Sequence, residues 1–277
     1  MPTLEQAYTP FFHQLCDAAG QIVVKYFRQD IPVDDKQDKS PVTQADREIE
    51  QVLRGMINKA FPDHGIIGEE FGRENEHAEF VWCLDPIDGT KSFITGRPMF
   101  GTIIGLLREG KPVMGAVDQA VTKERWLGVT NQSATCNGKP ARVAPPRKLE
   151  SSKLYVGSLD MFRGEDIWNY LRLCHAAKLT QYACDVYAYG LLAIGWCDVV
   201  VEKRLKIHDV AGVIPIVTGA GGVAWDWQSQ ALAEKNLIAD YDGKFIAASS
   251  QPLAEECAVL LTTQNPSRDN PFEREQT

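Results

Sequence analysis

The chain has 277 residues, of which 44% are hydrophobic and 24% are charged. These proportions are ordinary for a globular protein, and they exclude a chain that is disordered throughout. The net charge of -8 argues against generic electrostatic binding to nucleic acid or to an anionic membrane. The 7 cysteines are too sparse for a small disulfide scaffold, and no two of them have the spacing of a zinc site.

The first residues contain no basic segment followed by an apolar stretch, and no window approaches the ~18 apolar residues that a spanning helix needs. We therefore predict a cytoplasmic protein with reduced cysteines. We also predict that it has no nucleic-acid partner and no membrane partner.

The first half of the chain is predicted to be α+β. Apolar residues recur at helical spacing over residues 4–27 and 43–61, with Thr43 as an N-cap and Asp46 three positions later. Residues 29–39 between them are polar and favour a loop or an irregular pair of strands. After the second helix the spacing changes to that of short strands separated by turns. The predicted strands cover residues 66–67, 80–84, 102–107, 113–117 and 125–129.

Residues 140–148 contain three prolines and are the best candidate for a linker. Strands and helices alternate after it, as in an α/β unit. The strands cover residues 154–157, 197–201 and 245–248, and the helices cover residues 166–177, 186–194, 209–220 and 252–263. We therefore predict an N-terminal subdomain over residues 1–145, a C-terminal subdomain over residues 146–265 and a disordered tail over residues 266–277.

Two carboxylates three residues apart follow an apolar strand. They belong to the segment Asp85-Pro86-Ile87-Asp88-Gly89. Positions i and i+3 of a continuous strand face opposite sides. Because Pro86 breaks a strand and Gly89 permits a tight turn, both carboxylates can instead converge at the strand end. The alternative is an ordinary turn with solvated Asp residues.

The chemistry of this segment suits a divalent cation beside an anion. Its carboxylates and the Ile87 carbonyl between them are hard oxygen ligands, which Mg²⁺ prefers. Thr90 and Lys91 follow and can begin a helical turn whose N–H groups favour an anion. Metal ions beside an anion site are what phosphoryl transfer requires.

Three further acidic residues stand at the edges of apolar elements. Glu69 follows a short strand, Asp46 lies on the polar face of the second helix, and Asp209 begins a helix. Each has a simpler interpretation, namely an acidic turn, a solvated helix face and a helix cap. The acidic sites together are a stronger signal than any one of them.

In combination, these segments resemble the inositol monophosphatase superfamily of Mg²⁺-dependent phosphatases. The shared segments, in the family's order and spacing, are Ser40-Pro41-Val42-Thr43 with Asp46, Gly68-Glu69-Glu70, Asp85 to Thr90, and Asp209-Val210-Ala211-Gly212 followed by Ala220-Gly221-Gly222. The resemblance implies an α/β fold, a layered αβαβα sandwich with the active site between its two halves. It also implies two or three Mg²⁺ ions and a homodimer.

The resemblance assigns metal ligands and catalytic residues. The implied metal ligands are Glu69, Asp85, the Ile87 carbonyl, Asp88 and Asp209. Asp85 would bridge two ions. Glu69 and Thr90 would orient a metal-activated water that attacks the phosphate monoester directly, without a covalent enzyme intermediate.

The resemblance also implies binding and supporting roles. The amides of Gly89 and Thr90 would hold the phosphate, and Glu202 and Asp209 would contact the substrate. The residues that would support the catalytic groups are Lys36, Thr43 and Asp46.

Two positions depart from the family's pattern. His208 stands where many members have Trp, and Lys39 stands where Gly is common. His208 could neighbour a metal, but we favour a packing or surface role.

Several segments resemble the histidinol-phosphatase branch. They are Asp118-Gln119, Glu124-Arg125-Trp126, residues 185–189 and residues 214–217. A carboxylate pair of Asp185 and Glu202 would suit the cationic end of histidinol phosphate, because opposite charges attract strongly in a partly desolvated pocket. The alternative for Asp185 is an N-cap of the helix that follows.

We therefore predict a Mg²⁺-dependent hydrolase of a small phosphate monoester, with histidinol phosphate of histidine biosynthesis as the preferred substrate. Two alternatives stay open. One is an inositol-1-monophosphatase or another sugar or nucleotide phosphatase of the same superfamily. The other is a non-catalytic regulatory protein that binds a phosphometabolite.

Overall fold

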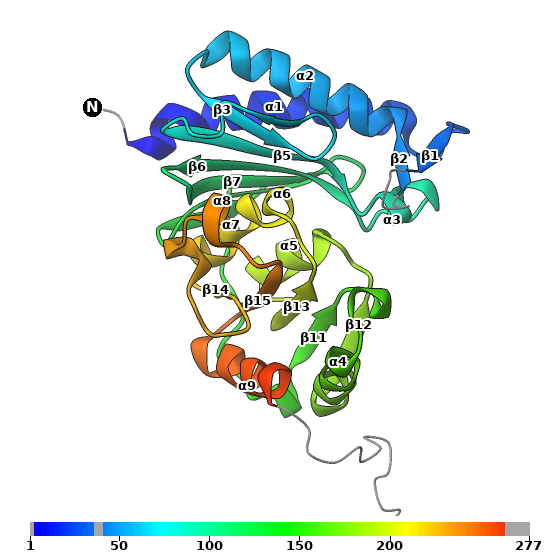
Figure 1. Ribbon diagram of the computed structural model, residues 1–277, viewed down its shortest axis with the longest axis vertical. Helices are drawn as coiled ribbons and strands as arrows, with labels where there is room; N and C mark the ends of the chain where they lie inside the picture. Colours follow the sequence, from blue (N-terminus) through cyan, green and yellow to red (C-terminus); the bar gives the residue numbers. More distant parts are fainter. Residues whose placement is uncertain (1–2, 36–40, 264–277) are drawn as a thin grey trace, which may run out of the picture.

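The computed structural model describes residues 3–35 and 41–263 of the chain. Helices α1 (Leu4–Tyr26) and α2 (Gln44–Ala60) cover one face of an eight-stranded sheet. A middle layer of short helices separates this sheet from a five-stranded sheet, whose outer face is covered by α4 (Glu165–Ala176) and α9 (Gln251–Thr262) (Figure 1). The predicted layered αβαβα sandwich is therefore confirmed.

The eight-stranded sheet comes from the first half of the chain, with the strand order β10-β9-β8-β7-β6-β5-β3-β4. Its strands are β3 (Gly65–Gly68), β4 (Gly72–Glu74), β5 (Phe80–Asp88), β6 (Gly101–Arg108), β7 (Lys111–Gln119), β8 (Glu124–Val129), β9 (Ser133–Cys136) and β10 (Lys139–Pro140). Neighbours pair antiparallel except β3 and β5, which are parallel. Beside it, β1 (Val33–Asp35) pairs with β2 (Pro41–Thr43). Strand β1 lies within residues 29–39, predicted as a loop or an irregular pair of strands, whereas its partner β2 follows that segment.

The five-stranded sheet has the order β12-β11-β13-β15-β14. Its strands are β11 (Lys153–Val156), β12 (Leu179–Tyr182), β13 (Val199–Lys203), β14 (Val223–Trp225) and β15 (Lys244–Ala248). The remaining α-helices are α3 (Thr90–Ile94), α5 (Tyr187–Ala193), α6 (Ile207–Ala211), α7 (Val213–Gly219) and α8 (Leu237–Asp240), and short 3-10 turns cover Leu149–Ser151, Leu159–Met161 and Leu232–Glu234.

The central strands β5, β6 and β7 of the eight-stranded sheet are buried along most of their length, and their sequences are correspondingly rich in apolar residues. Successive side chains of a strand point to opposite faces. In β5, Trp82 and Leu84 join the core beneath α1 and α2, whereas Val81 and Cys83 join the core shared with the middle helices. The carboxyl end of β5 therefore lies between the two halves of the molecule.

The single helix predicted over residues 209–220 is divided into α6 and α7 at Gly212. A Cβ atom on Gly212 would lie 2.7 Å from Ile103 Cγ2, and one on Gly115 would lie 2.0 Å from the Gly212 oxygen. The backbone of this helix pair thus packs directly on β6 and β7, which only glycine allows. This close packing brings Asp209 to the end of β5.

The remaining elements largely match the prediction, although the strands β4, β9, β10, β12 and β14 and the short helix α8 were not predicted. Residues 141–148 contain no regular structure and lead from the larger sheet to the smaller one, while the subdomain boundaries themselves stay predictions. All seven cysteines are free. Among the described residues, no helix combines the length and apolar character that crossing a membrane requires. Lys36, Lys39 and the tail predicted over residues 266–277 lie outside the described residues.

Candidate active site

Asp85 and Asp88 are brought together by a bulge in β5. Asp85 stands opposite Ile103 of β6, and Asp88 stands opposite Gly101, so three steps along β5 match two steps along β6. The extra residue changes the side to which the later side chain points. The expectation that Pro86 breaks the strand is wrong, because β5 continues to Asp88, but the expected convergence of the two carboxylates is found.

The acidic side chains form two groups that share one member. Ligand atoms of Asp85, Asp88 and Asp209 all lie within 4.8 Å of one another, and so do those of Glu69, Asp85 and His208. Three carboxylates of the predicted metal-ligand set, those of Glu69, Asp88 and Asp209, are therefore gathered around Asp85, and His208 joins them from outside that set. Their coordination of an ion stays a prediction.

Burial and mutual repulsion act on these carboxylates together. The pKa of Asp85 is raised well above its usual range by burial first and then by the charges of Glu69, Asp88 and Asp209. Asp85 is 2% exposed, and its Oδ1 has no hydrogen-bond partner among the described residues. An unpaired buried carboxylate is costly unless a cation neutralises it. Because its neighbours Glu69, Asp88 and Asp209 also offer carboxylate oxygens, the site fits Mg²⁺.

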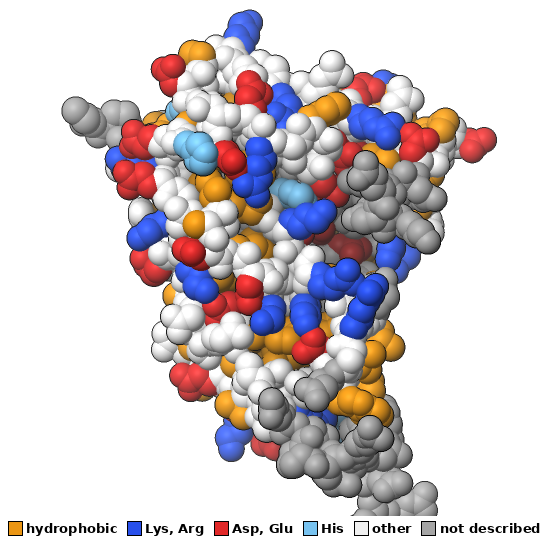
Figure 2. All heavy atoms as spheres, viewed as in Figure 1, with side chains coloured by type: hydrophobic (Ala, Val, Ile, Leu, Met, Phe, Trp, Pro, Cys, Tyr) orange, Lys and Arg blue, Asp and Glu red, His pale blue; other side chains and the backbone are white. Residues whose placement is uncertain are grey.

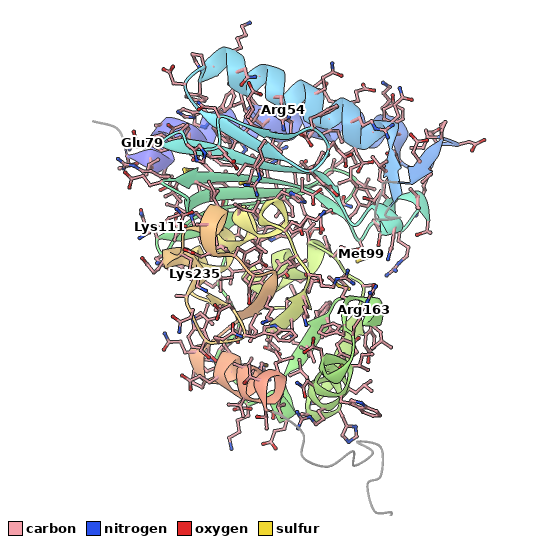
Figure 3. The ribbon with its side chains drawn as sticks, viewed as in Figure 1. Arg54, Glu79, Met99, Lys111, Arg163 and Lys235 are labelled. Atoms are coloured by element: carbon pink, nitrogen blue, oxygen red, sulfur yellow. The ribbon has the colours of Figure 1, made fainter. Side chains whose placement is uncertain are left out.

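Glu69 is held in place by a residue that the sequence analysis missed. Glu50 of α2 is fully buried, and its carboxylate accepts hydrogen bonds from the backbone N–H groups of Glu70 at 2.7 Å and Phe71 at 3.1 Å. Arg54, labelled on α2 in Figure 3, donates to the same carboxylate at 2.8 Å. The available signal was a Glu and an Arg four residues apart on one helix.

Thr43 and Asp46 form the predicted cap of α2. Asp46 Oδ2 accepts hydrogen bonds from the Thr43 N–H at 2.8 Å and from its hydroxyl at 2.6 Å, and the Thr43 hydroxyl oxygen accepts from the Ala45 N–H. Asp46 is buried, so the solvated helix face considered as an alternative is wrong. Burial raises the pKa of Asp46, with a further contribution from the charge of Glu69. The cap therefore lies within electrostatic reach of the metal-ligand group.

The turn after Asp88 depends on glycine. Gly89 has a φ of 91°, and a Cβ atom there would lie 2.9 Å from both Asp185 Oδ2 and the Met99 carbonyl oxygen. Figure 3 places Met99 at the junction between the two halves of the molecule. Helix α3 begins at Thr90, and the Thr90 hydroxyl donates to the Ile87 carbonyl at 3.1 Å. The predicted helical turn is therefore present beside the carboxylates.

Asp185 joins the two halves and does not cap a helix through its side chain. Its Oδ2 accepts a hydrogen bond from the Ser92 hydroxyl at 2.8 Å, whereas Val186 is the N-cap of α5 and lacks a side-chain cap. The next backbone N–H, that of Val186, donates to Asp88 Oδ2. Burial raises the pKa of Asp185, while the Ser92 bond and the charge of Arg97 oppose that shift. The sequence analysis missed Ser92.

Glu202 lies on β13 and is 7% exposed. Its Oε2 accepts a hydrogen bond from the Tyr189 hydroxyl at 2.5 Å, a partner that the sequence analysis missed. Burial raises the pKa of Glu202 to about 8, with smaller contributions from the charges of Asp185 and Asp209. The carboxyl is therefore mostly protonated at neutral pH until a cation approaches it.

Asp209 and His208 are consecutive residues of α6 that both face the acidic groups. Asp209 Oδ2 accepts a hydrogen bond from the Lys206 N–H at 2.6 Å, which is the helix-cap role considered for it. His208 is 6% exposed and its Nε2 lies 3.4 Å from Asp209 Oδ1, so a surface position for His208 is wrong.

Figure 2 shows Lys and Arg side chains gathered across the middle of one face, between the two halves.

The family model described as "Inositol monophosphatase family" matches residues 4–264. The chain belongs to the inositol monophosphatase family. This membership accounts for the fold, since the chain is similar to an inositol monophosphatase from Zymomonas mobilis with a TM-score of 0.82 and 36% identity. That match covers 94% of this chain and 99% of the other.

Two curated relatives of this family are phosphatases by name. The chain is 45% identical over 215 residues to "Bifunctional phosphatase IMPL2, chloroplastic" of Arabidopsis thaliana, a match that covers 77% of this chain and 62% of the plant protein. It is 34% identical over 222 residues to a "Histidinol-phosphatase" of Chlorobaculum parvum, covering 78% of this chain and 85% of that protein. The chain thus spans less than two thirds of the plant relative. The family and these relatives are phosphatases. The family is named for inositol monophosphate and the Chlorobaculum parvum relative for histidinol, whereas the plant relative's name gives no substrate.

Proposed function

We propose that the protein is a Mg²⁺-dependent phosphomonoesterase whose substrate is histidinol phosphate. The observation that carries this proposal is the position of two extra carboxylates beside the metal-ligand groups. Asp185 contacts the Gly89 turn. Glu202 lies close enough to Asp185 that the charge of Asp185 contributes to raising the pKa of Glu202. A substrate with a phosphate at one end and an ammonium and an imidazole at the other suits this arrangement, because the cationic end would neutralise the pair.

The proposed metal ligands are Glu69, Asp85, the Ile87 carbonyl, Asp88 and Asp209. When two or three Mg²⁺ ions are bound, they supply Lewis-acid chemistry that lowers the pKa of water and shields the phosphoryl oxygens. The Gly89 and Thr90 amides would hold the phosphate, and Asp209 with Glu202 would contact the substrate's other end. The name of the Chlorobaculum parvum relative supports this substrate.

Glu69 and Thr90 would orient the attacking water. The Thr90 hydroxyl donates its proton to the Ile87 carbonyl, so its oxygen is left to accept a hydrogen bond from that water. Glu69 would accept the water's other proton. The Thr43–Asp46 pair would support Glu69 from the start of α2, where the negative charges of Asp46 and Glu69 lie close enough to interact. Lys36 is retained as a proposed support, outside the described residues. The attack would be direct, since the proposed site uses no Ser or Cys nucleophile.

A panel of phosphate monoesters compared by kcat/KM tests this function. We expect histidinol phosphate to exceed inositol 1-phosphate, sugar phosphates and nucleoside monophosphates, with phosphate release that requires Mg²⁺. Asp185→Ala should raise KM for histidinol phosphate more than for any neutral ester. Asp63→Ala, which removes an exposed charge elsewhere, is the matched control.

Inositol 1-phosphate is the second candidate substrate, favoured by the similarity to the Zymomonas mobilis enzyme. If it gives the higher kcat/KM, the histidinol phosphate proposal is wrong and the phosphatase proposal stands. If no ester releases phosphate, the protein is a binding protein of this fold. A homodimer and a cytoplasmic location also stay proposals, and the molar mass in solution tests the first.

A further inference from the structure

His208 is an imidazole among carboxylates. One of its ring nitrogens lies within 4.8 Å of a carboxylate oxygen of Glu69 and one of Asp85, and these two oxygens also lie within 4.8 Å of one another. The second group, of Asp85, Asp88 and Asp209, contains oxygen atoms alone. The two neighbouring groups therefore differ in chemistry, although they share Asp85.

We propose that His208 is a nitrogen ligand of the ion held by Glu69 and Asp85, which makes that position selective for a transition-metal ion such as Co²⁺ or Zn²⁺. The neighbouring position, bounded by Asp88 and Asp209, keeps the oxygen-only set that suits Mg²⁺. Imidazole favours Zn²⁺ and related ions, whereas Mg²⁺ favours carboxylate, carbonyl and water. This inference rests on the metal site of the proposed function, and it adds a preference that the oxygen ligands do not supply.

A buried atom without a partner points to a ligand at this place. Asp85 is 2% exposed, its Oδ1 has no hydrogen-bond partner among the described residues, and it belongs to the group that contains His208. Buried polar atoms are nearly always paired, so an unpaired oxygen on the one carboxylate that both ligand groups share is consistent with a bound cation.

The other contacts of His208 do not explain why an imidazole is buried at this position. The structure shows no hydrogen bond from the imidazole to any described residue. Its Nε2 lies 3.4 Å from Asp209 Oδ1, which is longer than a normal hydrogen bond. His208 also lines a cavity of about 470 Å³ together with Gly68, Arg73 and Lys206. Glu69 and Asp85 do not line this cavity, so His208 is the one of the three proposed ligands that borders it. The nearby cations weaken the binding of every divalent ion alike, so the ratio of two affinities isolates the effect of the ring.

The test is a titration of the metal-free full-length protein with Co²⁺ alone and, separately, with Mg²⁺ alone. We expect His208→Phe to weaken the tighter Co²⁺ binding step by about 10-fold to 100-fold and Mg²⁺ binding by less than about 3-fold. The Co²⁺ protein should also give a strongly shifted, exchangeable imidazole N–H proton signal in its NMR spectrum. This signal should be absent from the variant.

Two further variants separate ligation from a structural role. His208→Gln keeps a hydrogen-bond donor that could orient Asp209, and it should lose the Co²⁺ preference as His208→Phe does. His77→Phe removes an exposed imidazole elsewhere and should retain both the affinity and the NMR signal. Each variant is folded if its melting temperature in EDTA equals that of the wild type. If His208→Phe does not fold, His208→Gln alone is sufficient to test the inference.

Retention of the shifted signal by His208→Gln, or an unchanged ratio of Co²⁺ to Mg²⁺ affinity in that variant, overturns the inference. These readouts need no substrate. If wild-type protein hydrolyses histidinol phosphate with Mg²⁺ while the Co²⁺ results are unchanged in the variants, the inference about His208 fails alone. If the Co²⁺ results are as expected and no ester is hydrolysed, the proposed function fails alone.

Discussion

Two regions of the molecule bury aspartates in opposite ways. Between α1 and the larger sheet, Asp118 is 6% exposed and accepts a hydrogen bond from Arg125 Nε at 2.6 Å, while the same guanidinium reaches Asp17 at 2.8 Å. At the end of β5, Asp85 is 2% exposed and has other acidic side chains around it, with its Oδ1 unpaired among the described residues. The two aspartates are thus buried to a similar extent, but one is paired with an arginine and the other is surrounded by carboxylates.

The comparison of Asp118 with Asp85 shows whether the cation that neutralises a buried carboxylate comes from the chain itself or from solution. The fold supplies its own cation to Asp118, because Arg125 stands directly across from it in the pairing of β7 with β8. At Asp85, burial and like charges together oppose ionisation, so the ionised site requires a cation from solution. A buried carboxylate with an arginine is part of the architecture, whereas one that faces carboxylates is a candidate for function.

The strongest way to break this comparison is Asp85→Asn. We expect phosphate release to fall by roughly 10³-fold or more, because the residue shared by both ligand groups loses its charge. The melting temperature in EDTA should equal or exceed that of the wild type, since one of several repelling carboxylates has been removed. Wild-type-like turnover, or a marked loss of stability without metal, would show that Asp85 belongs to the architecture.

The opposite behaviour is expected of Arg125→Met. Removing the guanidinium leaves Asp118 buried without its cation, which should lower the free energy of unfolding by about 3 kcal/mol, whether or not metal is present. Urea denaturation measures the change. Arg108→Met is the control, because its ion pair with Glu79 is half exposed and should cost less than about 0.5 kcal/mol. Equal losses for the two variants would contradict the comparison.

Glu50→Gln tests the region that connects architecture to the site. The charge-assisted bonds to the N–H groups of Glu70 and Phe71 are weakened, so the loop with Glu69 is held less firmly. We expect metal affinity, measured by calorimetric titration, to fall by about 10-fold. The free energy of unfolding, measured by urea denaturation, should fall by about 1 kcal/mol. Glu48→Gln, on the same helix and paired with Lys25, should leave metal affinity unchanged.

The last expected effect is a pH dependence at Glu202, which needs no change in the metal-ligand groups. Its pKa in the folded protein is raised to about 8 from the ordinary 4.5, so the folded state holds a proton that the unfolded state releases between these values. Stability in EDTA should therefore fall as pH rises from 6 to 8, by about 1–2 kcal/mol from this group. Glu202→Gln should remove that part of the slope.

A matched pair of variants isolates the origin of that slope. Glu124 accepts a similar bond from the Tyr187 hydroxyl at 2.6 Å but is only partly buried. Glu124→Gln should leave the pH dependence between 6 and 8 as it is in the wild type. If both variants flatten the curve equally, the slope is not specific to the buried carboxyl of Glu202, because the bond from tyrosine lowers a carboxyl pKa.

The sequence by itself determined the features that depend on local spacing. The helical periodicity of residues 4–27 and 43–61 and the capping box of Thr43 and Asp46 can be read within one or two turns of the chain, and the structure confirms them. The apolar segments likewise located β3, β5, β6, β7 and β8 of the larger sheet, whereas the short edge strands β4, β9 and β10 gave no such signal. The acidic segments were found because each adjoins an apolar element whose end is marked by glycine, proline or a change of periodicity.

Only the tertiary structure decided which charges meet. The bulge that turns Asp88 toward Asp85 depends on pairing with β6, and the approach of Asp209 depends on glycine packing between α6, α7 and the sheet. The partners Glu50, Ser92 and Tyr189, and the burial of His208 beside Glu69, likewise arise from contacts between distant segments. Backbone propensities act over a few residues, whereas the pairing or isolation of a buried charge depends on every element packed around it.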